Sequence, residues 1–190
     1  MDVWHGENFD KYKFKELVYW VLANKCVDLD SFRLCCYYYY NMSTIGRWIH
    51  MAVMRNIKQL NLYFIPKEMP QAIELPHCLV TCGSLEFMGF PALRVLVLTY
   101  VELLGDTDLV KGLIESCPLL EDLSFIECES SKLDHIFISC PKLKRLSIIN
   151  SEDGHNVRIS CPKLEVLDLK DYITCNVFFD RLDSLNKFVY

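Results

Sequence analysis

The chain has 190 residues, 52% of them hydrophobic, and a formal net charge of −5. This length suits one domain, 1–190, with a sizeable core. The acidic balance argues against nucleic acid and against an anionic membrane as partner, because both attract clustered Lys and Arg. The longest apolar run, near Val95 to Leu104, is interrupted by polar residues and is too short to span a bilayer.

The first predicted element is a helix over residues 8–24, "NFDKYKFKELVYWVLAN". We expect it to cap the structure that begins near residue 25, with its apolar side chains directed to the core. These side chains are Phe14, Leu17, Val18, Val21 and Leu22.

Further helices are predicted in the first half of the chain. One face is formed by Ile45, Trp48, Ile49, Ala52 and Val53, with Ser43 as its N-cap. A short helix is predicted at 75–82, where Pro76 lies in the first turn. Another follows Thr107 and carries Leu109, Val110, Leu113 and Ile114 on one face.

The second half of the chain repeats one phrase. "SCPLL" at 116–120 and "SCPKL" at 139–143 and 160–164 recur at intervals of 23 and 21 residues. Each opens the phrase Cys-Pro-x-Leu-x-x-Leu-x-Leu, whose last position is Phe, Ile and Leu in the three copies. The alternating end of the phrase is a strand signal. Proline ends the preceding segment, and cysteine is small enough for a tight corner.

Weaker copies of the strand phrase occur elsewhere. They begin at Leu29, Ile57, Leu93 and Leu185, whereas a copy at Leu85 fits poorly and starts too close to Leu93 for a full turn of chain. We therefore expect an irregular stretch at 85–92. The segments between the late copies are too short for helices, and Leu133–Ile138 and Val157–Ile159 are predicted as second strands.

A period of 20 to 29 residues is typical of leucine-rich repeats. One coil alone buries too little apolar surface to offset the cost of ordering its residues, so only stacked coils are stable. The predicted fold class is α/β: a short, irregular leucine-rich-repeat (RNI-like) solenoid of about six or seven coils over residues 25–190. It has a parallel concave sheet, with helices and then strands on the convex side.

Ten cysteines recur partly in phase with the repeat. We expect them to be reduced and mostly buried, which predicts an intracellular protein, in the cytoplasm, the nucleus or both. His77, Cys78 and Cys82 are three potential metal ligands, but structural zinc usually needs four. A Cys–His nucleophile pair has no supporting motif either. No cofactor and no catalytic residue is predicted.

Two surfaces are candidates for binding. "CCYYYYN" at 35–41 is either an exposed aromatic patch or a strand end with alternate Tyr buried. The outward positions of the concave strands are the second candidate, and their charge alternates from coil to coil. This alternation is either pairing between coils on a solvated face or a protein-binding surface. The partner-binding candidates are Arg94, Glu121, Asp122, Lys144, Arg145, Glu165 and Asp168.

Three stretches carry a resemblance to a known family. "WIHMAVMRNIKQLNL" at 48–62, "LPHCLVTCGSLEF" at 75–87 and "SCPLLEDLSFIEC" at 116–128 resemble signatures of plant F-box/leucine-rich-repeat proteins of the FBD type. The resemblance covers nearly the whole chain. The family's F-box and its C-terminal FBD segment have no counterpart in these 190 residues.

The resemblance implies a non-catalytic module that recognises substrates for an SCF-type (cullin-RING) ubiquitin ligase. A Skp1-type adaptor is expected to bind only if the missing F-box is supplied, and the target protein is unknown. The alternative is an orphan leucine-rich-repeat interaction protein with no role in a ligase.

Overall fold

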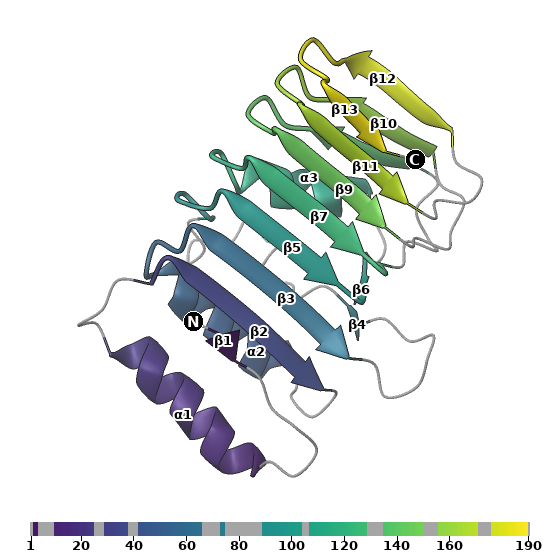
Figure 1. Cartoon of the computed structure of the whole chain (residues 1–190). Helices are drawn as coiled ribbons and strands as arrows, with labels where there is room; N and C mark the ends of the chain where they lie inside the picture. Colours follow the sequence, from purple (N-terminus) through teal and green to yellow (C-terminus); the bar gives the residue numbers. More distant parts are fainter. Residues whose placement is uncertain are drawn as a thin grey trace.

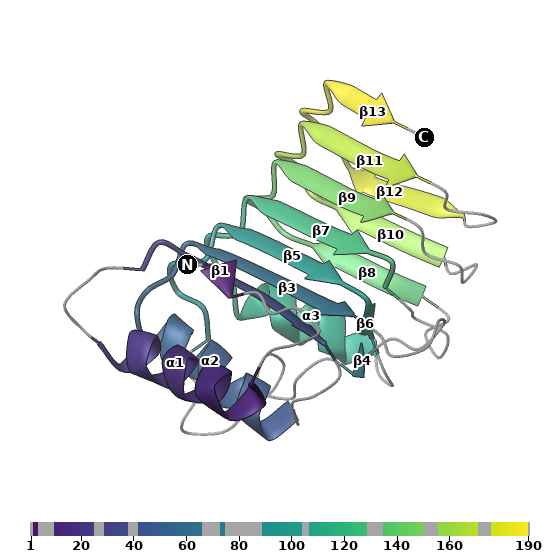
Figure 2. The ribbon, with the colours of Figure 1, turned by 60° about the horizontal axis from the view of Figure 1, so that its bottom comes forward.

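The computed structural model describes residues 2–3, 10–24, 29–37, 42–65, 73–74, 89–103, 107–128, 135–149, 156–170 and 176–189. The described chain is an α/β solenoid whose coils stack in sequence order (Figure 1). A long parallel sheet forms one layer, and helices followed by a shorter sheet form the other (Figure 2). The predicted fold class is confirmed.

The long sheet, which we call the concave sheet, has eight strands within the described ranges. Every pair of neighbours is parallel, as expected when each strand returns through a crossover. The strands in spatial order are β1 (Asp2–Val3), β2 (Ser31–Tyr37), β3 (Gln59–Ile65), β5 (Val95–Thr99), β7 (Asp122–Ile126), β9 (Arg145–Ile149), β11 (Val166–Lys170) and β13 (Lys187–Val189). Seven of these follow the predicted phrases. The short strand β1 was not predicted.

The convex side changes character along the chain. It begins with the helices α1 (Lys11–Ala23), α2 (Met42–Val53) and α3 (Thr107–Glu115). It continues with a parallel sheet of β8 (His135–Ser139), β10 (Asn156–Ser160) and β12 (Val177–Arg181). The change from helices to strands was predicted. Strand β12 was not, and neither was the two-stranded sheet of β4 (Ile73–Glu74) and β6 (Val101–Glu102).

The repeated phrase is a turn followed by a strand. The N–H of Leu120 donates to the carbonyl of Cys117 at 3.1 Å, and Leu143 and Leu164 donate in the same way to Cys140 and Cys161 at 3.3 and 3.0 Å. Proline occupies the second position of each turn, where its fixed φ is favourable. All three leucines are fully buried. The strand itself starts two residues after this leucine, one residue before the alternating end of the phrase.

The residue after each anchoring leucine joins its coil to the next one. The carbonyl of Glu121 accepts the N–H groups of both Lys144 and Arg145, at 2.8 and 3.0 Å. The carbonyl of Lys144 does the same for Glu165 and Val166, at 2.8 and 3.0 Å. This double contact fixes the register between coils and is repeated from Asp30 to Lys187.

Residues 89–92 are the described part of the stretch that was predicted to be irregular. Phe90-Pro-Ala-Leu93 is the same corner with phenylalanine in place of cysteine, since Leu93 N–H donates to the Phe90 carbonyl at 3.2 Å. The N–H of Phe90 in turn donates to the carbonyl of Ser116, at 2.7 Å. Gly89 has φ +68, and a Cβ there would lie 2.9 Å from that same Ser116 oxygen. Only glycine fits this approach. Residues 75–88, which include the predicted helix at 75–82, lie outside the described part of the chain.

Helix α1 closes the N-terminal end of the convex layer. Asp10 is its N-cap and accepts from the N–H of Tyr12 at 3.0 Å. Phe14, Val18 and Leu22 are buried as predicted, and Phe14 meets the ring of Trp48 on α2. The prediction for Leu17 was wrong: α1 packs on α2, and Leu17 lies on the exposed side of the helix, 51% exposed.

Helix α2 buries the predicted face, and each of its five residues is at most 8% exposed. Its start was predicted wrongly: the helix begins at Met42, so Ser43 lies inside the first turn. There the Ser43 carbonyl accepts from Arg47 Nε at 3.3 Å.

Candidate protein-binding face

The face of the concave sheet that points away from the core is built from aligned rows. We call the residues immediately before the strands the rim: Asp30, Lys58, Arg94, Glu121, Lys144, Glu165 and Asn186. The first row is Ser31, Gln59, Val95, Asp122, Arg145, Val166 and Lys187. The second row is Arg33, Asn61, Val97, Ser124, Ser147, Asp168 and Val189. The third row is Cys35, Tyr63, Thr99, Ile126, Ile149 and Lys170.

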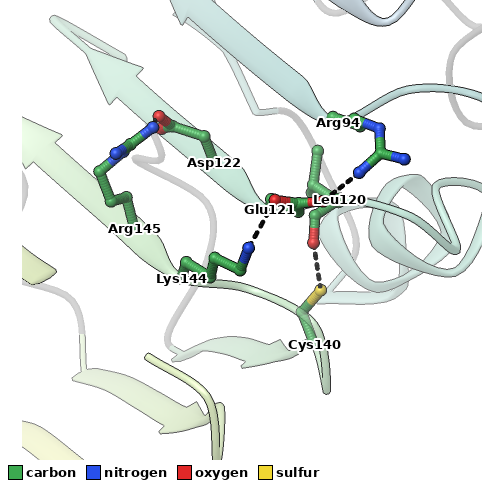
Figure 3. Close-up of polar contacts among 7 residues, drawn as sticks. All are labelled: Arg94, Leu120, Glu121, Asp122, Cys140, Lys144 and Arg145. Atoms are coloured by element: carbon green, nitrogen blue, oxygen red, sulfur yellow. Dashed lines mark hydrogen bonds and ion pairs between the residues drawn. The ribbon is translucent and has the colours of Figure 1, made fainter. Parts of the chain in front are cut away.

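The structure brings most of the predicted site residues together as ion pairs between coils (Figure 3). Glu121 lies between two cations: it pairs with Arg94, and its Oε2 is 2.9 Å from Lys144 Nζ. One row further in, Asp122 Oδ2 accepts from Arg145 Nε at 2.7 Å. Charged residues of neighbouring coils therefore pair with each other, as one of the two interpretations of the alternating charges expected.

Glu121 and Arg145 have pKa values shifted by these pairs. The hydrogen bond from Lys144, supported by Arg94, lowers the pKa of Glu121 from its usual 4.5. The hydrogen bond to Asp122 raises the pKa of Arg145. Glu121 thus has a cation on each neighbouring coil, and Asp122 has one on the next coil.

The other two predicted site residues, Asp168 and Glu165, are not part of these ion pairs. Asp168 is in the second row, and its Oδ2 is 3.2 Å from Lys170 Nζ on the same strand. Its Oδ1 is buried and has no hydrogen-bond partner among the described residues. Glu165 lies on the rim, exposed, and adds to the electrostatic effect that raises the pKa of Arg145.

Sequence reasoning missed the third row. Tyr63, Ile126 and Ile149 are large apolar residues of this row. They point away from the core and are half-buried. The Leu-x-x-Leu-x-Leu phrase ends one residue too early to include them. Extending the alternation by one outward position past the final leucine would have found them. In the earlier "CCYYYYN" segment, Cys35 is half-buried at this row, and residues 38–41 lie outside the described part of the chain.

The buried thiols of the described residues are poor nucleophiles. Cys117, Cys128, Cys140 and Cys161 are buried, as predicted, and are free thiols. The Sγ of Cys140 donates to the Leu120 carbonyl at 3.7 Å (Figure 3). Burial raises the pKa of Cys128 to about 12 and that of Cys161 to about 11, so both are protonated at neutral pH.

Within the described ranges, no three His, Cys, Asp or Glu residues are close enough together to hold a metal ion. His77, Cys78 and Cys82 fall in the stretch that the structure does not describe. None of the described helices is both long enough and apolar enough to cross a bilayer.

The fold and this face define the class: a leucine-rich-repeat solenoid that offers an open parallel sheet. Residues 45–190 match the family described as FBD-associated F-box protein At5g56370, LRR repeats. The chain belongs to this family, which confirms the resemblance seen in the sequence.

Several similar proteins are from Arabidopsis thaliana. F-box/FBD/LRR-repeat protein At5g56420 is 31% identical over 147 residues, covering 67% of this chain and 34% of the relative. F-box/FBD/LRR-repeat protein At3g52680 is 31% identical and covers 76% of this chain and 35% of the relative. F-box/FBD/LRR-repeat protein At5g56570 is 30% identical and covers 84% of this chain and 38% of the relative. The chain thus spans little more than a third of the length of these relatives. No solved structure matches it significantly.

Proposed function

We propose that this chain is a non-catalytic protein-recognition module and that it selects substrates for an SCF-type (cullin-RING) ubiquitin ligase. The observation that carries the proposal is the open face of the concave sheet, which presents aligned rows of side chains over seven successive strands. Such a surface suits an extended protein contact. The ligase role rests on the names of the relatives, which are F-box proteins.

The chemistry of the described residues supports a binding role. Arg94, Glu121, Asp122, Lys144 and Arg145 are engaged in ion pairs between coils, and the thiols with raised pKa values are poor nucleophiles. A Skp1-type adaptor is then expected to bind only through an F-box supplied in addition to these residues. The cytoplasm, the nucleus or both are the compartments in which this role would be exercised, and a fluorescent fusion in plant cells tests this.

The test joins an F-box from one of the relatives to residue 1 of this chain and expresses the chimera in plant cells. Proteins whose ubiquitination rises are compared with those found for the chimera carrying Ser147→Trp, which fills the middle of the concave face. Ser139→Trp is the matched control, because Ser139 is an exposed strand serine on the convex sheet.

The proposal expects a set of ubiquitinated proteins that is lost with Ser147→Trp and kept with Ser139→Trp. If bound proteins are lost with Ser147→Trp but their ubiquitination never rises with the chimera, the chain is an interaction protein without a ligase role. If neither substitution changes what is bound, the concave face is not the recognition surface.

A further inference from the structure

A hollow with a volume of about 440 Å³ opens on the outer face of the convex sheet. Its described lining residues come from three strands: Ile136 and Phe137 of β8, Asn156 and Arg158 of β10, and Phe178 of β12. Figure 2 shows these strands side by side behind the concave sheet. The hollow therefore lies on the side of the molecule opposite to the rows of the concave face.

The register of the convex sheet places one cation between two aromatic rings. Phe137, Arg158 and Phe178 are register partners on neighbouring strands. Ile136 and Val157, which precede the first two along their strands, are buried, so the partners point to solvent by the alternation of a strand. The two phenylalanines are 37% and 48% exposed. One exposed phenylalanine is ordinary, but two beside the same arginine at a hollow form an apolar patch with a charge at its centre.

Arg158 has hydrogen-bond donors that the described residues leave unused. Its ion-pair partner is Asp180, whose Oδ2 lies 3.6 Å from Arg158 Nε, too far for a hydrogen bond. Both side chains are about half exposed, and an exposed pair of this kind contributes little to stability. The N–H groups of the guanidinium therefore remain able to donate to a further acceptor.

Asn156 supplies a second donor at the hollow. Its Oδ1 accepts from Asn176 Nδ2 at 3.1 Å. This hydrogen bond occupies the oxygen of the Asn156 amide and leaves its NH₂ group as a donor. The polar side chains that line the hollow thus offer donors, and the other lining side chains are apolar. Donors between aromatic rings suit an anionic group that is attached to an apolar one.

The charge of the site favours a carboxylate over a phosphate. A phosphate group carries about two negative charges at neutral pH, and Asp180 next to Arg158 would repel it. A carboxylate carries one charge and accepts two parallel hydrogen bonds from a single guanidinium.

The shape of the hollow favours a ligand that is presented by a protein. All of its described lining residues belong to one sheet, so a ligand is contacted from one side. A small molecule in a specific site usually has about 70–90% of its surface buried. A side chain of a partner protein needs no such enclosure, because the rest of the contact spreads over the surface around it. Here that surface includes Phe179 of β12, which is 47% exposed.

We propose that this hollow binds an acidic side chain of a partner protein, Asp or Glu, that is followed by an aromatic residue. The carboxylate accepts from the guanidinium of Arg158 and the amide of Asn156, and the aromatic residue packs on Phe137 and Phe178. The convex sheet thereby gives the solenoid a second recognition surface, separate from the concave face. Ser139 does not line the hollow, so it remains a suitable control position for the concave face.

The experiment selects binders to the whole chain from a displayed library of twelve-residue peptides with Glu-Phe fixed at the centre. The selected peptides are titrated against wild type, Arg158→Gln and Phe178→Ala. Arg181→Gln and Phe188→Ala are the matched controls, because Arg181 is exposed on β12 outside the hollow and Phe188 is 53% exposed on the concave sheet. Each peptide is also made with Gln in place of its Glu, and 3-phenylpropionate is titrated as a small acid with the same groups. Circular dichroism and urea unfolding check that each variant is folded.

The proposal expects binders that lose at least tenfold in affinity with Arg158→Gln and with Phe178→Ala, and less than twofold with each control. Replacing Glu by Gln in the peptide should weaken binding to wild type at least tenfold. The same replacement should have less than a threefold effect with Arg158→Gln, since the cation that pairs with the Glu is then already absent.

The proposal is overturned if no such binders are found, or if Arg181→Gln weakens them as much as Arg158→Gln does. It is also overturned if 3-phenylpropionate binds as tightly as the peptides, because the hollow is then a site for small organic acids. Each of these results leaves recognition by the concave face standing.

Discussion

Replacing Gly89 by alanine is expected to destabilise the solenoid strongly for a single methyl group. Gly89 has φ +68, a region that costs an L-residue about 1–2 kcal/mol. The added Cβ would lie 2.9 Å from the Ser116 carbonyl oxygen, which also accepts the Phe90 N–H at 2.7 Å. Relief of that clash weakens a buried hydrogen bond worth about 1 kcal/mol. We expect Gly89→Ala to lower the free energy of unfolding by about 2–3 kcal/mol.

Urea unfolding followed by circular dichroism measures this change. Gly89→Asn separates its two causes, because asparagine tolerates positive φ better than alanine but brings the same Cβ toward Ser116. The asparagine variant should fall between wild type and alanine. The reasoning is refuted if Gly89→Ala unfolds within about 0.5 kcal/mol of wild type, since that is the range of an ordinary surface substitution.

Three further predictions concern the thiol of Cys128, the ion pairs of Glu121 and the strands of the concave sheet. Cys128, with its pKa raised to about 12, should remain unmodified by a maleimide at pH 8 in the native chain and react fully in urea, as read from the intact mass. The lowered pKa of Glu121 contributes stability that is present above pH 4.5 and is lost as the pH falls through the folded-state pKa. Urea midpoints of Glu121→Gln should therefore depend less on pH in this acid range than those of wild type, and equal slopes would contradict the assignment. Hydrogen exchange should be slowest in β7 and β9 at the centre of the concave sheet and faster in β13, where Phe188 is 53% exposed; equal protection would contradict this order.

The sequence predicted the fold well because the repeat is a local pattern with a simple physical cause. Each Cys-Pro-x-Leu turn sets up one strand, and the buried alternation after it is visible in the letters. Strand β12 was missed because it contains Phe178 and Phe179 in succession and both are about half exposed, so it shows no alternation of burial. Leu17 was assigned to the core because a helical pattern does not say how many neighbours the helix has.

The candidate site was predicted only in part. The alternation of charge identified Glu121, Lys144 and Arg145, but pairing between coils depends on the register of the sheet. The third row of the concave sheet depends on that register too, and the positive φ of Tyr100 follows from no propensity of tyrosine.

Because the same pair of backbone hydrogen bonds joins successive coils at the rim, one coil can be removed or added without changing the joint. Glu121 offers its carbonyl to Lys144 and Arg145, and Lys144 offers the same pair of contacts to Glu165 and Val166. A deletion of residues 145–165 would therefore join Lys144 directly to Val166. The N–H groups of Lys144 and Val166 would then donate to the Glu121 carbonyl, as those of Lys144 and Arg145 do now. On the convex side β8 would meet β12, and Phe137 would come to lie beside Phe178, since both align with Arg158. Unequal recombination between gene copies could thus shorten or lengthen the face by whole coils, changing the targets within reach while leaving each joint intact.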